Sequence, residues 1–122
     1  MIALDASVLI AIMLDQPEAA TFKTALRQES SIVIGWPTLF ETRTVLAAKG
    51  FSNPGGIVTG LSKAPNVVTI AFDRIHYLAP EMAFDRYGKG RHPASLNMGD
   101  CFSNAVAAIV KAPLLFKGQD SG

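Results

Sequence analysis

The chain has 122 residues, of which 49% are hydrophobic and only 17% are charged, and it contains one cysteine. This composition suits one globular domain with a buried core, and it excludes long disordered tails and a disulfide framework. No apolar run approaches the roughly 20 residues that span a bilayer, and the first residues lack the basic leader of a signal peptide. We therefore expect a protein of the reducing cytoplasm without membrane contact.

The first feature along the chain is an apolar run, residues 1–4, that stops at Asp5. A short apolar run followed by a helical pattern over residues 7–14 predicts a buried parallel strand that enters a helix. In an open α/β sheet, functional groups gather beyond the carboxyl ends of the strands, where Asp5 is expected. A second interpretation is that Asp5 only caps the helix, and this stretch leaves both open.

The next segments continue the alternation of helix and strand. We expect a helix at 18–28, a β-branched strand at 31–35 and a helix from 36 to about 49. In the last of these, Thr38 and Glu41 have the spacing of a capping box. Glu41 can therefore be explained as a helix-capping residue with no role in chemistry.

The second half of the chain repeats the pattern. We expect helices at 57–63, 73–87 and 101–110, and strands at 67–71 and 114–117. Asp100 lies in the turn that starts the last helix, where a carboxylate complements the helix dipole. Helices that alternate with strands predict a single α/β domain over residues 1–122.

Residues 85–93 form the most polar, glycine-bearing segment of the chain. Its cationic side chains are those of Arg86, Lys89, Arg91 and His92. A basic loop above a cleft would contact phosphates, but a solvated connector would have the same composition. Both interpretations stay open.

Chain topology sends four acids to one edge of the expected sheet. In right-handed β-α-β units, strand ends and helix starts fall on the same edge. Asp5 and Asp120 follow strands. Glu41 and Asp100 lie near helix starts. Asp73 also reaches this edge, so location at the edge is necessary for a shared site but does not establish one.

A cluster of such acids needs a counter-charge, because like charges raise one another's pKa values. Ligands that are all oxygens suit Mg²⁺ or Mn²⁺, and such a site can activate water and stabilise a phosphodiester transition state. Setting the four acids aside leaves six acidic residues against eleven basic ones on the rest of the chain. That surplus of positive charge favours a polyanionic substrate.

Several motifs stand in a fixed order along nearly the whole chain. They are LDAS at 4–7, Glu41, YGKGRHPA at 87–94, LNMGDC at 96–101 and PLLFKG at 113–118. In this set the chain resembles a PIN-domain ribonuclease, and most closely a VapC-type toxin of a type II toxin–antitoxin pair. The resemblance implies a central parallel sheet of order 3-2-1-4 flanked by helices. It also implies a homodimeric, Mg²⁺- or Mn²⁺-dependent endoribonuclease that hydrolyses RNA with a metal-activated water and is silenced by a cognate antitoxin.

The resemblance also assigns residues. Asp5 and Asp100 match the principal metal ligands, and Glu41 matches the third acid, which holds the metal or its water. Ser7 matches a hydroxyl that orients Asp5, although a serine at a helix start has an equally good structural interpretation.

One position departs from the family pattern. Relatives commonly carry Gly-Asp-Asp after the last strand, whereas this chain has Gly118, Gln119 and Asp120. Either Asp120 takes the place of the usual fourth acid or the site works with three. An alternative is a non-catalytic PIN-like binding module with a degraded metal site. A third reading, a receiver or P-loop enzyme, lacks the second aspartate after the first strand and a Gly-x-x-x-x-Gly-Lys loop.

Overall fold

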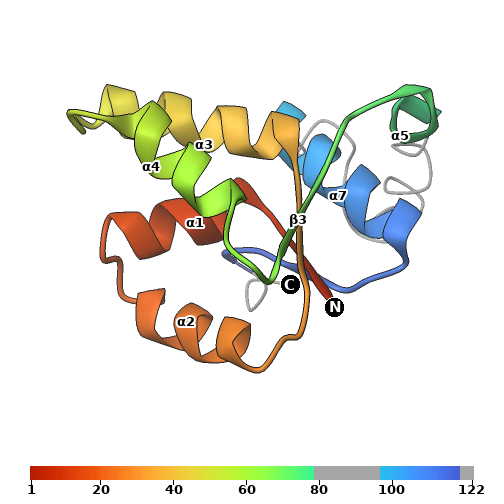
Figure 1. Ribbon diagram of the computed structural model, residues 1–122, viewed down its shortest axis with the longest axis horizontal. Helices are drawn as coiled ribbons and strands as arrows, with labels where there is room; N and C mark the ends of the chain where they lie inside the picture. The colour runs from red at the N-terminus through yellow and green to blue at the C-terminus, as the bar shows by residue number, and fades with distance from the viewer. Residues whose placement is uncertain (79–96, 119–122) are drawn as a thin grey trace.

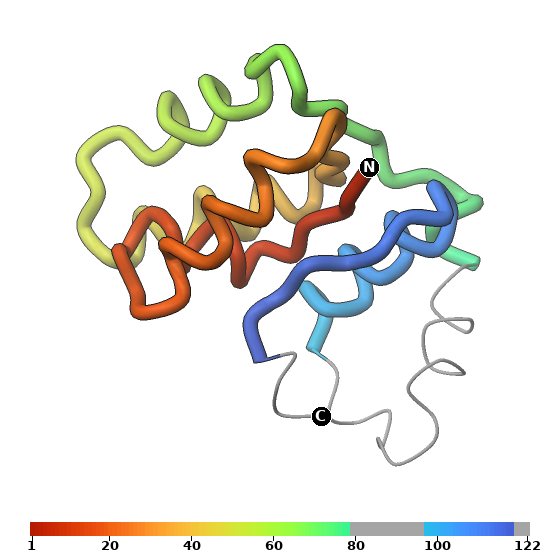
Figure 2. The backbone as a smooth tube through the Cα atoms, turned by 90° about the horizontal axis from the view of Figure 1, so that it is seen from below, coloured from red at the N-terminus to blue at the C-terminus, as the bar shows by residue number. Residues whose placement is uncertain are grey.

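The computed structural model describes residues 1–78 and 97–118. Within them, four strands form one sheet in the order β3-β2-β1-β4, and every pairing is parallel. The strands are β1 (Ile2–Leu4), β2 (Ile32–Gly35), β3 (Val67–Ile70) and β4 (Leu114–Leu115). Figure 2 shows β1 and β4, the first and last described strands, running side by side. The predicted α/β architecture and strand order are confirmed.

The described helices lie on both sides of this sheet. They are α1 (Ala6–Met13), α2 (Ala19–Arg27), α3 (Trp36–Ala48), α4 (Pro54–Ser62), α5 (Arg74–Leu78) and α7 (Met98–Val110). In Figure 1, α1 to α4 lie on one side of the strands, and α5 and α7 lie on the other. None of these helices combines the length and apolar character that crossing a membrane requires.

The core lies where the helices α1 and α3 meet β1 and β2. All four residues of β2 are buried, as expected for a central strand that is covered on both faces. Val8, Ile34, Leu39 and Leu46 are among its largest fully buried side chains. Burial of each such side chain contributes about 1.5–3 kcal/mol, so this cluster holds the strand ends in place.

The start of α3 corrects one sequence expectation. Strand β2 runs directly into the helix, with Gly35 at the N-cap and no side-chain cap hydrogen bond. Thr38 therefore lies inside the first turn, where its hydroxyl is buried without a hydrogen-bond partner, and Glu41 is the sixth helical residue. The predicted capping box is wrong, because residue spacing does not reveal where the strand ends and the helix begins.

Two other helix boundaries differ from the predicted ones. Helix α4 begins at Pro54 rather than at residue 57, because the Asn53 side chain accepts a hydrogen bond from the backbone N–H of Gly56. Helix α7 begins at Met98, three residues before the predicted start. Of the helix predicted over 73–87, the described part is α5, and the remainder lies outside the described residues.

Candidate active site

Asp5 lies where β1 ends and α1 begins, and it is both a helix cap and a buried acid. Its Oδ2 accepts a hydrogen bond from the backbone N–H of Ser7 at 3.0 Å. Its Oδ1 accepts one from the hydroxyl of Ser103 on α7 at 2.5 Å. Only 6% of the residue is exposed. The capping interpretation is confirmed, and it does not exclude a functional role, because a carboxylate has about four lone-pair sites.

Asp100 lies in the first turn of α7, as the helix-dipole interpretation expects. Its backbone N–H donates to the side chain of Asn97 at 2.8 Å, and its Oδ2 accepts from the backbone N–H of Asn97 at 3.2 Å. This reciprocal pair is a capping box. The Asn104 side chain also donates to the backbone carbonyl of Asp100 at 2.7 Å. The backbone around this acid is therefore held by its own helix.

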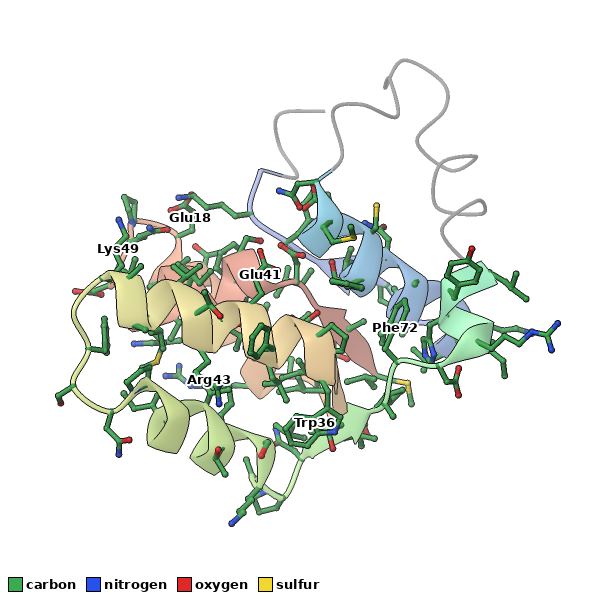
Figure 3. All side chains as sticks on the ribbon, turned by 90° about the horizontal axis from the view of Figure 1, so that it is seen from above. Glu18, Trp36, Glu41, Arg43, Lys49 and Phe72 are labelled. Carbon is green, nitrogen blue, oxygen red and sulfur yellow. The ribbon has the colours of Figure 1, made fainter. Side chains whose placement is uncertain are left out.

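Glu41 reaches the same place from α3. Its carboxylate lies against Gly99, where an added Cβ would stand 2.6 Å from Oε2. Its Oε1 is buried and has no hydrogen-bond partner. Burial raises the pKa of Glu41 above its ordinary value, and the nearby charges of Asp5 and Asp100 raise it further. In Figure 3, Glu41 lies between α3 and α7.

These three acids come from three separate parts of the chain, and the charges of Asp5 and Asp100 both act on Glu41. Within residues 1–78 and 97–118, no group of three or more Asp, Glu, His or Cys side chains stands in an arrangement that could hold a metal ion by itself. Two features nevertheless fit a hard cation: the unpartnered Oε1 of Glu41 and the open space at Gly99 that holds its carboxylate. The donors are all oxygen atoms, as Mg²⁺ and Mn²⁺ prefer.

Ser7 connects the start of α1 to the end of β4. Its hydroxyl accepts a hydrogen bond from the backbone N–H of Lys117 at 2.9 Å, while its contact with Asp5 is made by its own backbone N–H. The Lys117 ammonium donates to the Gln16 side chain at 2.8 Å. Ser7 therefore lies beside the site and anchors the segment that follows the last strand.

Five predicted site residues lie outside the described residues: Arg86, Lys89, Arg91, His92 and Asp120. Gln119 lies outside them as well. Sequence reasoning missed two contributors that the structure adds, Ser103 and Gly99. A signal existed only for Ser103, which is three residues after Asp100 and so shares its side of α7.

Comparison with known proteins shows the family of the chain. The PIN-domain family model matches residues 2–120. A protein named Ribonuclease VapC from Mycolicibacterium smegmatis is 39% identical over 118 residues, which is 95% of this chain and 90% of the relative. Ribonuclease VapC30 of Mycobacterium tuberculosis is 38% identical over 120 residues, covering 96% of this chain and 89% of the relative.

A solved structure supports the same fold. The crystal structure of VapC20 from M. tuberculosis, described as a toxin that cleaves the sarcin–ricin loop, matches with a TM-score of 0.76. The match covers 99% of this chain and 93% of that one at 16% sequence identity, so it bears on the fold alone. From the family model and the sequence relatives together, the chain belongs to the PIN-domain family, among the VapC ribonucleases.

Proposed function

We propose that this chain is a metal-dependent endoribonuclease toxin that hydrolyses RNA phosphodiester bonds in the cytoplasm and is silenced by a cognate antitoxin. The observation that carries the proposal is the placement of Glu41. Its buried, unpartnered carboxylate oxygen lies beside the first turn of α7 and within the influence of Asp5 and Asp100. A carboxylate in such surroundings is stabilised either by a proton or by a compensating charge, and a divalent cation would supply that charge.

In this mechanism, Asp5 and Asp100 would hold Mg²⁺ or Mn²⁺, with Glu41 as the third acid and Asp120 as a fourth. A bound cation lowers the pKa of water and offsets charge on the phosphate. Glu41 would orient the attacking water and accept its proton, because a carboxylate within hydrogen-bond reach of water can act as a general base. The N-terminus of α7 adds positive potential where the phosphate would bind.

The basic segment would supply contacts to the substrate. Arg86, Lys89, Arg91 and His92 stand in one glycine-bearing stretch, which suits binding to the RNA backbone. We expect Arg91→Ala to weaken RNA binding and to lower the salt dependence of binding by about one phosphate contact. Unchanged affinity and unchanged salt dependence would remove this segment from the mechanism.

Exposed apolar side chains support a homodimer. Phe40 on α3 is 62% exposed and Tyr77 on α5 is 73% exposed, and Leu78 and Met98 are also largely open to solvent. Large exposed apolar side chains of this kind, on either side of the sheet, are candidate contacts with a second chain. Light scattering should give twice the mass of the chain, and Phe40→Glu should shift it toward monomer. A wild-type mass of one chain at all concentrations would contradict the dimer.

The central experiment incubates the purified chain with total cellular RNA. Cleavage should require Mg²⁺ or Mn²⁺, should stop with a chelator, and should be absent in Asp5→Asn. Primer extension on the products then maps the cleavage sites. Cleavage that persists in the chelator or in Asp5→Asn would overturn the proposed mechanism.

Gln119 motivates a second candidate, a non-catalytic module that binds RNA or an antitoxin. It stands where relatives commonly have the fourth acid. This candidate predicts partner binding without metal-dependent cleavage by the wild type. It also predicts that Gln119→Asp, which restores the family pattern, will create cleavage activity that the wild type lacks.

A further inference from the structure

We propose that Ser103 is a positioning residue that holds the Asp5 carboxylate against α7 and so sets how Asp5 and Asp100 are arranged for a shared cation. This inference rests on the metal-dependent function proposed above. It adds a residue that contacts a metal-binding acid without binding the metal itself.

The hydrogen bond between Ser103 and Asp5 joins distant parts of the chain. The Ser103 hydroxyl lies 2.5 Å from Asp5 Oδ1, and the two residues are 98 positions apart. Ser103 is 1% exposed, so water does not compete for this contact. Because the acceptor is a carboxylate, this is a charge-assisted bond, the stronger class of hydrogen bond.

The hydroxyl of Ser103 has alternatives within its own helix. The backbone carbonyls of Gly99 and Asp100 lie 3.2 and 3.3 Å from Ser103 Oγ. A hydroxyl has one proton, so it donates to one of these three acceptors at a time. The shortest distance and the negative charge both favour Asp5. The carbonyl of Gly99 is the usual partner of a helical serine four residues later, and here it is the weaker competitor.

This choice of partner matters for the geometry of the site. Asp100 is fixed by the capping box at the start of α7, and Ser103 lies one turn later on the same side of that helix. The Ser103 bond therefore ties the end of β1 to the element that carries Asp100. The Ser7 backbone N–H donates a hydrogen bond to the other oxygen of Asp5. Each carboxylate oxygen therefore accepts a hydrogen bond, which restricts rotation of the side chain.

Removing the Ser103 hydroxyl should loosen Asp5 without removing a ligand. Partners that orient metal ligands typically contribute roughly 10- to 100-fold to metal affinity or activity. We expect Ser103→Ala to weaken Mn²⁺ binding within that range. It should also raise the Mn²⁺ concentration that gives half-maximal RNA cleavage by a similar factor.

The experiment measures Mn²⁺ affinity of the full chain by calorimetry, together with the metal dependence of cleavage. Ser103→Cys keeps the shape of the side chain, with a somewhat larger atom in place of the oxygen, but offers a weak donor, so it should weaken binding in the same direction. Ser103→Thr retains the hydroxyl and should bind Mn²⁺ as the wild type does. The matched control is Thr42→Val, because Thr42 is also 1% exposed but donates only to the backbone carbonyl of Thr38.

Each outcome decides the inference. If Ser103→Ala and Ser103→Cys both bind Mn²⁺ within twofold of the wild type, Ser103 does not position Asp5. If Thr42→Val weakens binding as much as Ser103→Ala, the effect is a general consequence of losing a buried hydroxyl and the inference fails. A wild type that neither binds Mn²⁺ nor cleaves RNA would instead overturn the proposed function. Should Ser103→Ala fail to fold, as circular dichroism would show, Ser103→Cys and Ser103→Thr decide the question.

Discussion

The carboxylate of Glu41 occupies the space that the missing side chain of Gly99 leaves open at the start of α7. This relationship brings an acid from the middle of α3 next to the helix that carries Asp100. It also explains why the pKa of Glu41 is raised, because the carboxylate is partly buried and lies near two other acids. The position of the Glu41 carboxylate therefore depends on the absence of a side chain at residue 99.

Gly99→Ala should lower the rate of RNA cleavage without lowering the free energy of unfolding. A methyl group at residue 99 would displace the Glu41 carboxylate, and misplacement of a catalytic group by about 1 Å can cost roughly 100-fold in rate. Alanine is otherwise favoured over glycine in a helix by roughly 0.5–1 kcal/mol, so the free energy of unfolding should not fall. Gly60→Ala in α4 is the control, because nothing lies within 4 Å of a Cβ there. Full cleavage activity in Gly99→Ala would show that Glu41 does not need its present position.

Asp5→Asn should abolish cleavage while leaving α1 intact. Asparagine caps helices about as well as aspartate, so the bond from the Ser7 backbone N–H can persist. The loss of activity should exceed the roughly 10- to 100-fold effect expected for residues that only orient a ligand. Asp100→Asn should behave alike, because an amide oxygen can still accept from the Asn97 backbone. Wild-type rates in either variant, with unchanged circular dichroism, would remove that acid from the site.

Metal binding should raise thermal stability, and Asp5→Asn should cancel the gain. A ligand that binds only the folded state stabilises it by about 2.7 kcal/mol at a concentration 100 times its dissociation constant. Unfolding curves with Mn²⁺ and with chelator measure this difference. If Mn²⁺ raised the unfolding temperature of Asp5→Asn as much as that of the wild type, the cation would bind at a site without Asp5.

The stability of the metal-free protein should depend on pH through Glu41. Its pKa in the folded protein lies above the ordinary value of 4.5, so the folded state binds this proton more tightly than the unfolded state does. Stability should therefore fall as pH rises from about 4.5 through the raised pKa. Glu41→Gln should flatten this decline and raise the unfolding temperature at neutral pH, while abolishing cleavage. Asp15→Asn removes an exposed acid and serves as the control; an unchanged pH profile in Glu41→Gln would contradict the burial of its charge.

Leu46→Ala should destabilise the fold by about 2–5 kcal/mol, because it removes a fully buried side chain of α3 from the hydrophobic core. Val68→Ala, on the half-exposed surface of β3, should cost less than about 1 kcal/mol. Chemical denaturation measures both. Similar losses in the two variants would mean that Leu46 is not part of a tightly packed core.

The sequence by itself determined the parallel sheet and the edge at which the acids lie. Short apolar strands that alternate with helices predict right-handed β-α-β units, so the shared edge of Asp5 and Asp100 follows from local patterns and chain direction. The order β3-β2-β1-β4 was implied by the family resemblance, and the structure confirms it. The spacing of Thr38 and Glu41 predicted a capping box that does not form. That interpretation depended on where β2 ends and α3 begins, and no local signal in the sequence marks this boundary.

Tertiary structure alone decided which groups touch. The bond between Ser103 and Asp5 spans 98 positions, and the fit of Glu41 against Gly99 joins two helices. Such contacts depend on how helices pack across the sheet, and packing is set by the whole core rather than by any short segment. Topology brought the acids to one edge of the sheet, and the packing of α7 against β1 and of α3 against α7 made them neighbours.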